Sequence, residues 1–420
     1  MVRLRARTGM SQQELADLVP GWTQTKVGRV ERGERDTLYD LRELLAFADA
    51  VGMPREALAP LFLGDPDAVA AADAPQGAGV DDGVIDRRTF AERTMLASAG
   101  FALPATGARP PERVTDAHLR LLQASLDALR TQDRASGGTG LVRHGVALFQ
   151  RARATLDAAD HTDRVGRELL GLCAQTGVIA GFVAYDADVQ AVARTLFSES
   201  VLLAETSGDP ALVALAYASM ALHSTHLGRT TGRPGPAREA LRLLDRATAA
   251  IRYERNCARL HALIEMRKAP AAALLGDAAT ARLTISAARR SLDEHHDDDE
   301  SRVLEFVTPA EITGFEAASF LDLGKPAEAL KSYTAVLAQL PKGKLYDRSR
   351  VYYRAMVAHS LHRMGDTAAA LDKAVELIPA FENGASSRRA LTRLTPLRAT
   401  TTDESFTTRF DTLTTTLQTP

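Results

Sequence analysis

Hydrogen-bonding side chains between positions 24 and 29 are the residues whose types best fit a defined chemistry. Gln24, Thr25, Lys26 and Arg29 lie on the polar face of a predicted helix. A glutamine amide can form two hydrogen bonds with adenine, arginine or lysine can donate to guanine, and a threonine methyl group can contact thymine. These four side chains therefore have the chemistry needed to read base edges in a DNA major groove.

Residues on either side of this helix have the chemistry of phosphate contacts. Gln12 and Thr23 stand near helix N-termini, where side chains and backbone N–H groups can donate to phosphate oxygens. Arg32 and Arg35 follow the helix and suit the flanking DNA backbone. The alternative interpretation is a pair of helices used only for protein contact, with these residues as a solvated polar face.

The surrounding sequence predicts two short helices that meet at a tight turn. Ser11 and Glu14 form a capping box at the start of the first helix, and Pro20-Gly21 ends it. Thr23 caps the second helix and Gly33 ends it. The apolar residues expected to face inward are Leu15, Ala16, Val19, Val27 and Val30. Ala16 is small enough for close approach, so the pair is predicted to be a helix-turn-helix.

A third and a fourth helix are expected directly after this pair. The third carries apolar residues at spacings of three and four: Leu38, Leu41, Leu44, Leu45, Ala48 and Val51. The fourth begins at Pro54, a residue suited to a first helical turn.

The pattern resembles the lambda-repressor-like (XRE) family of helix-turn-helix domains. The matching residues are Gln12, Ala16, Gly21, Val27, Val30, Glu31 and Gly33. The turn Leu-Val-Pro-Gly-Trp has one residue more than that family's usual spacing, which would tilt the recognition helix slightly. The resemblance implies a DNA-binding domain over residues 1–64. Its contact residues would be Gln12, Thr23, Gln24, Thr25, Lys26, Arg29, Arg32 and Arg35.

The charge of this domain bears on how it would bind DNA. Residues 1–64 contain nine Lys or Arg and nine Asp or Glu, and the whole chain has a formal net charge of −2. Phosphate contacts supply most of the affinity of DNA-binding proteins, so one neutral copy should bind weakly. We therefore expect a homodimer on a two-fold operator with half-sites about one helical turn apart. The dimer surface would lie in the C-terminal helices or in residues 113–157.

The remainder of the chain is predicted to be all-α. Residues 65–112 are predicted to form a linker of small residues, interrupted by Gly and Pro, with one short helix. Arg87-Arg88 in this segment resembles a twin-arginine export signal, but it does not lie at the N-terminus, so an amphipathic helix is the favoured interpretation. Residues 113–400 form amphipathic helices, with turns predicted at Ala187, Gly228, Gly276, Gly324 and Gly365. The first and last of these steps are both 41 residues, and the two between are 48. Such a period indicates stacked helical hairpins. In residues 401–420, Phe406, Phe410, Leu413 and Leu417 predict a capping helix.

The turns resemble those of the tetratricopeptide (TPR) repeat. The matching residues are Gly276-Asp277 with Ala281, Gly324-Lys325 with Ala329, and Gly365-Asp366 with Ala370. The resemblance implies a TPR-like α-solenoid whose first helices line a groove. The residues expected to face that groove as effector contacts are Gly177, Gly181, Glu311, Gly314, Tyr352, His359 and His362. Close helix packing, which also favours glycine, is the equally weighted alternative.

The combination of these two parts resembles the peptide-pheromone-responsive regulators of Gram-positive bacteria. The resemblance implies a transcriptional regulator whose array dimerises and senses a peptide or small molecule. Groove asparagines hold the peptide in those regulators, but this chain has only Asn256 and Asn383. An interaction scaffold that recruits a protein to DNA is the second hypothesis.

Other functions receive little support from the sequence. No phosphate-binding glycine loop or nucleophile motif occurs, so no enzyme and no cofactor are expected. Residues 295–300 read His-His-Asp-Asp-Asp-Glu, but consecutive residues rarely converge on one metal, so a solvated loop is favoured. The two cysteines, Cys173 and Cys257, fit core positions. With no secretory leader and no long apolar run, a cytoplasmic protein without membrane contact is expected.

Overall fold

The computed structural model describes residues 2–32, 34, 46–48, 50–51, 110–254, 257–294, 302–343, 346–385 and 387–417. Within these ranges the chain is all-α, apart from an isolated β-bridge between Arg113 and Asp160. The expected fold class, an N-terminal helix-turn-helix followed by an array of stacked helices, is confirmed for this part of the chain. The chain divides into two compact units. The first unit is Met1–Ala128 with Val146–Leu172, and the second is Leu129–Gly145 with Cys173–Pro420.

The first unit begins with three short helices, α1 (Val2–Thr8), α2 (Gln12–Leu18) and α3 (Gln24–Glu31). The predicted capping box is present: the Ser11 hydroxyl accepts from the Glu14 N–H, and the Glu14 carboxylate accepts from the Ser11 N–H. Gly21 has φ 77°, a left-handed conformation that glycine adopts without strain, and it lets the chain turn from α2 to α3.

The core of the first unit forms beneath these helices. Its buried residues are Leu4, Met10, Leu15, Ala16, Leu18, Val19, Trp22, Val27, Phe47, Val51 and Ala117. Trp22 stacks on Phe47 with ring centroids 5.5 Å apart and planes 18° apart. Four of the five residues expected to face inward are buried, and Val30 is half-buried.

Several expected elements lie outside the described residues. The third helix is described only at residues 46–48 and 50–51, which are helical, and Phe47, Ala48 and Val51 are buried there. Gly33, the remaining apolar residues of that helix, the helix at Pro54 and the linker over residues 65–109 are not described.

Three longer helices contribute residues to both units: α8 (Asp116–Ser136), α9 (Val142–Ala158) and α10 (Asp163–Asp186). Of the described helices, α10 is the one long and apolar enough to cross a membrane, but 67% of its most apolar window is buried inside the protein. This degree of burial is typical of a core helix in a globular protein.

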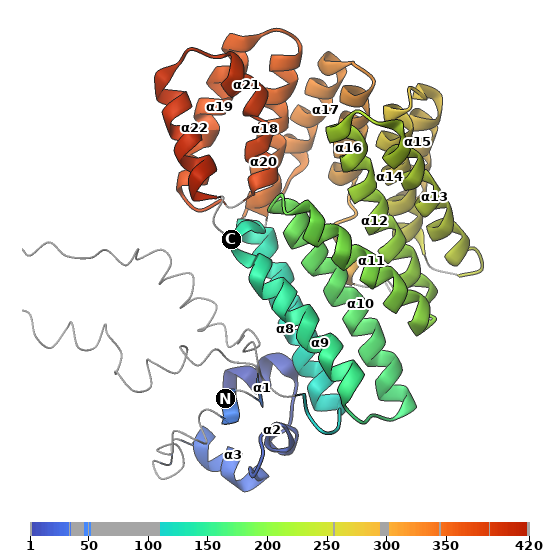
Figure 1. Cartoon of the computed structure of the whole chain (residues 1–420), viewed down its shortest axis with the longest axis vertical. Coiled ribbons are helices and arrows are strands. Elements are labelled where there is room, and N and C mark those ends of the chain that lie inside the picture. Colours follow the sequence, from blue (N-terminus) through green and yellow to red (C-terminus); the bar gives the residue numbers. More distant parts are fainter. Residues whose placement is uncertain are drawn as a thin grey trace, which may run out of the picture. The chain divides into compact units, whose positions relative to one another are not determined.

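The second unit is built from consecutive helical hairpins (Figure 1). Their first helices are α10, α12 (Pro210–Thr231), α14 (Ala258–Leu274), α16 (Pro309–Asp322) and α18 (Asp347–Arg363). Their second helices are α11 (Gln190–Ser207), α13 (Pro234–Ala250), α15 (Ala278–Asp293), α17 (Pro326–Gln339) and α19 (Thr367–Glu382). Each hairpin packs on the next: α14 contacts α12 and α13 on one side and α16 on the other. Short 3-10 helices lie at Thr139–Leu141 and Arg302–Leu304.

The predicted turns are confirmed at four positions and wrong at one. Ala187 lies in the turn between α10 and α11. Gly276, Gly324 and Gly365 follow the first helices of their hairpins and have φ of 81°, 72° and 85°. Gly228 lies inside α12, and the chain turns at Gly232, with φ 66°. Gly228 is a packing residue, because a Cβ there would lie 3.3 Å from the backbone nitrogen of Ala237 in α13.

The C-terminal helices are α20 (Arg388–Thr392), α21 (Thr395–Thr400) and α22 (Glu404–Thr416). Phe406, Phe410 and Leu413 are buried in a cluster shared with α18 and α19, and Leu417 packs against that cluster. Helix α22 thus covers the last hairpin.

Candidate nucleic-acid interface and ligand pocket

Helix α3 presents most of the side chains expected to read DNA bases. The Thr23 hydroxyl accepts a hydrogen bond from the Lys26 N–H at 3.3 Å and so caps the helix. Val27 is fully buried and fixes the inner face of α3. Gln24 and Thr25 are exposed, and Lys26 is half-buried. The Lys26 ammonium lies 5.4 Å from the centroid of the Trp22 ring.

The arginines of the predicted interface are held by an intramolecular carboxylate. Arg29 and Arg32 both donate to Glu34, at 2.7 and 2.9 Å. The Arg29 side chain is 43% exposed and that of Arg32 is 62% exposed. These hydrogen bonds lower the pKa of the Glu34 carboxyl. Arg35, also expected to contact DNA, lies outside the described residues.

A second carboxylate ties the three N-terminal helices together. Glu31, at the end of α3, accepts two hydrogen bonds from Arg5 of α1, at 2.7 and 2.9 Å, and one from the Gln12 amide of α2 at 2.8 Å. The Arg5 hydrogen bond is the main cause of the lowered pKa of Glu31. Gln12, expected to contact phosphate, therefore supports α3 in this structure. Arg5 was missed by the sequence reasoning, because an ion pair across 26 positions leaves no spacing signal.

The second unit contains a pocket of about 310 Å³, in which three of the predicted groove residues meet. Glu311 and Gly314 of α16 and Tyr352 of α18 line it. The other four predicted residues do not. Gly181 is buried against Phe197, to which an added Cβ would approach within 2.6 Å, and Gly177 is buried in α10. The His359 ring contacts the Arg393 carbonyl at 3.1 Å, and His362 is half-buried in α18.

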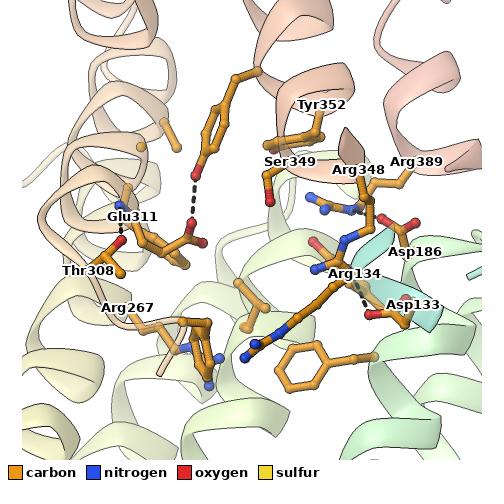
Figure 2. Close-up of a pocket in the computed structure, with 18 of the residues that line it drawn as sticks. Asp133, Arg134, Asp186, Arg267, Thr308, Glu311, Arg348, Ser349, Tyr352 and Arg389 are labelled. Carbon is orange, nitrogen blue, oxygen red and sulfur yellow. Dashed lines mark hydrogen bonds and ion pairs between the residues drawn. The ribbon is translucent and has the colours of Figure 1, made fainter. Parts of the chain in front are cut away.

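Ion pairs join helices that are distant in sequence around this pocket (Figure 2). Arg348 of α18 pairs with Asp133 of α8 at 2.7 Å, and Arg389 of α20 pairs with Asp186 of α10 at 3.2 Å. The Arg389 guanidinium also lies 4.0 Å from the centroid of the Tyr352 ring. Burial raises the pKa of the Asp133 carboxyl. These contacts fix the wall of the pocket.

Two further charged residues face the pocket from the side of α14 and α16. The Glu311 carboxylate accepts a hydrogen bond from the Tyr353 hydroxyl at 2.8 Å, and burial raises its pKa. Arg267 is 2% exposed, its guanidinium lies 5.6 Å from the Phe182 ring centroid, and its pKa is lowered by burial to about 9. The spacing before each turn gives no signal for Arg267, Arg348 or Arg389, because none of them occupies one of the predicted groove positions.

The caps, the turn at Gly21 and the buried core place α1–α3 in the helix-turn-helix class, in which one helix is exposed for DNA contact. The comparison with protein families agrees: residues 3–61 match the model of a helix-turn-helix domain. This match supports a DNA-binding domain at the N-terminus. No curated protein matches the chain.

Proposed function

We propose that the chain is a transcriptional regulator that acts as a homodimer and whose helical array senses an effector. The exposed face of α3 carries the proposal, because Gln24 and Thr25 are exposed on a helix fixed by a buried core. A rigid helix that displays amides and cations is suited to major-groove recognition. The site residues on DNA would be those expected from the sequence, with Gln12 acting partly through its support of α3.

The remaining parts of the proposal depend on the array and on charge. The hairpin turns at Gly276, Gly324 and Gly365 favour a TPR-like solenoid, and the pocket offers room for a small effector. A two-fold operator would double the phosphate contacts of a neutral domain. The likeness to peptide-responsive regulators supports the architecture, whereas the pocket favours a small molecule over a peptide. We also propose that the protein is cytoplasmic and has no enzymatic activity.

Selection of bound duplexes from a random library by the purified full-length chain tests DNA recognition. A two-fold consensus is expected. Replacing Arg29 by Ala should weaken binding to it by roughly 5–150-fold, the value of a good base contact. Arg289→Ala is the matched control, because that arginine is also ion-paired and is 46% exposed, close to the 43% of Arg29.

Trp22 supplies the folding control for these variants, because it is the only tryptophan of the chain and is buried in the first unit. Unchanged Trp22 emission with lost binding would support a base-reading role. A chain that selects no consensus at low salt would contradict the proposal. A stable protein partner with no response of DNA binding to small molecules would favour the interaction scaffold.

A further inference from the structure

Arg267 of α14 is a buried cation that forms no ion pair with a carboxylate of the described residues. The residue is 2% exposed, and its Nε has no hydrogen-bond partner among the described residues. Its guanidinium donates to the Ser219 hydroxyl over a long 3.5 Å. Within the described residues no Asp or Glu forms an ion pair with it, although Glu311 lies close enough to interact electrostatically. A buried charge in this condition costs folding free energy.

The other charged residues of the pocket are already paired or hydrogen-bonded. The lining contains six arginines and four carboxylates. Asp133 forms an ion pair with Arg348, and Asp186 forms one with Arg389. The Glu311 carboxylate accepts a hydrogen bond from the Tyr353 hydroxyl. The fourth carboxylate, Glu305, lies 3.6 Å from Arg134, which is long for an ion pair. Arg229 pairs at 2.6 Å with Asp322, which is not part of the lining. Arg267 itself is left without an ion pair among the described residues.

The shape of the pocket and its apolar residues limit what could neutralise this charge. A volume of about 310 Å³ accommodates a small molecule rather than a folded segment. Phe182 lies under the guanidinium of Arg267, and Phe315 and Leu222 also line the pocket. Arg134 extends into the same space from α8 (Figure 2). A ligand that fits would combine one ring system with an anionic group.

We propose that this pocket binds a small amphipathic anion, a carboxylate or phosphate on an apolar body, whose charged group is held by Arg267 with the assistance of Arg134. The inference rests on the proposed function in so far as this ligand is the effector, but binding itself requires no DNA. A guanidinium donates to both oxygens of a carboxylate or phosphate, and in a buried site such hydrogen bonds are strong. Bound anion would supply the partner that Arg267 lacks.

Two fluorescent probes that differ only in charge test the proposal. 1-Anilinonaphthalene-8-sulfonate is anionic, and N-phenyl-1-naphthylamine has the same rings without the sulfonate. The full-length chain should bind the sulfonate at one site per chain and roughly 10–100-fold more tightly than the neutral probe, the value of a charge-assisted hydrogen bond. In Arg267→Met this preference should disappear, while neutral-probe binding remains. Equal affinities for the two probes in the wild type, or a preference that survives in Arg267→Met, would overturn the proposal.

The stability of the variant separates a ligand-binding arginine from a structural one. Methionine replaces an uncompensated charge by an apolar chain of similar length, so Arg267→Met should unfold at the same temperature as the wild type or higher. Arg289→Met, at an exposed ion pair in α15, is the matched control and should change neither probe's affinity. A large loss of stability in Arg267→Met would show that the guanidinium is part of the core and would contradict the proposal.

Competition in the unmodified chain keeps the inference testable without any variant. Benzoate and phenyl phosphate should displace the sulfonate probe, and benzamide, which is neutral, should not. The anion that displaces the probe at the lower concentration indicates whether the natural ligand is a carboxylate or a phosphate. Ala318→Trp, which fills the pocket from α16, should abolish binding of both probes. Displacement by benzamide as effective as by benzoate would refute the role of charge.

Failure of this proposal is distinguishable from failure of the proposed function. The probe measurements contain no DNA, and the duplex selection contains no probe. Charge-dependent binding without any effect of benzoate or phenyl phosphate on duplex affinity would leave the ligand class standing and remove the effector role.

Discussion

The Glu31 carboxylate at the end of α3 receives both hydrogen bonds of an Arg5 guanidinium fork from α1, at 2.7 and 2.9 Å. The Glu31 side chain is only 8% exposed, and the Gln12 amide of α2 donates a further hydrogen bond to it. One carboxylate thereby sets the orientation of α3 relative to the two helices before it. The position of α3 is thus controlled by charge as well as by the apolar core.

Replacing Glu31 by Gln should destabilise the first unit by about 1–3 kcal/mol, because it leaves a charged Arg5 without its partner. Urea unfolding followed by Trp22 fluorescence measures this loss, since the single tryptophan is buried in that unit. Glu34→Gln is the matched control, because Glu34 is 41% exposed and should cost little. Equal losses in the two variants would show that the Arg5 ion pair does not hold α3.

The same carboxylate predicts an acid limit for the first unit. The pKa of Glu31 is lower in the folded protein than its usual value, mainly through Arg5. Its contribution to stability is therefore complete above the ordinary carboxyl pKa of about 4.3 and is lost as the pH falls through the lowered value. Trp22 fluorescence during acid titration should report this transition, and in Glu31→Gln the contribution should be absent. Identical acid profiles would contradict the assignment.

In the proposed interface, Glu34 would compete with DNA for two arginines. Because Arg29 and Arg32 both donate to it at the protein surface, Glu34→Gln should release them for phosphate or base contacts. Duplex affinity should rise roughly 2–10-fold at low salt, and the gain should shrink at high salt, where exposed charges are screened. Fluorescence anisotropy of a labelled duplex measures both values. Unchanged affinity at low salt would mean that these arginines do not contact DNA.

The local signals of the sequence located the caps of α2 and α3. Ser11, Glu14 and Thr23 act through hydrogen bonds to residues three positions away, so their caps could be predicted from spacing and are present. Glycine turns at Gly276, Gly324 and Gly365 could be predicted for the same reason. Helix, cap and turn signals span only a few residues.

The pocket could be predicted only in part. Glu311 and Tyr352 follow from the positions before each turn, and they do line it. Arg348 and Asp133 are 215 positions apart, and Arg389 reaches Asp186 across 203. No periodicity connects such residues, because their meeting depends on how successive hairpins stack. Gly181 was predicted to line the groove, but it packs against the Phe197 ring. From sequence alone, a glycine that makes room for a ligand cannot be distinguished from one that makes room for a neighbouring ring.

Gly181 should behave as a packing residue. An added Cβ would lie 2.6 Å from the Phe197 ring of α11, so Gly181→Ala should destabilise the second unit by about 1–3 kcal/mol. Gly140→Ala is the matched control, since a Cβ at that exposed glycine of the short 3-10 helix meets nothing within 4 Å and the substitution should change stability little. Thermal unfolding followed by far-ultraviolet circular dichroism measures both. A Gly181→Ala variant of full stability that weakens probe binding would return this residue to the ligand site.

Buried histidines should make the second unit sensitive to mild acid. His226 of α12 is 6% exposed, and burial is the main cause that lowers its pKa to about 3. The unfolded chain, with a histidine pKa near 6.5, binds the proton first. Stability is therefore complete above about pH 6.5 and falls toward pH 3, by at most about 1.4 kcal/mol per pH unit for this group. Nearby Arg229, Arg389 and Arg393 oppose protonation further.

His226→Phe removes this proton and keeps a ring that can still pack at its edge contact with Tyr185, where the centroids are 5.2 Å apart. Its stability should match the wild type at neutral pH and exceed it at about pH 5, where carboxylates are still largely ionised. Urea unfolding of both proteins by circular dichroism at the two pH values measures the difference. Parallel loss of stability in the two proteins would show that His226 is not the group that titrates. His223 and His359, whose pKa values burial lowers to about 4, would then be the next described histidines of this unit to replace.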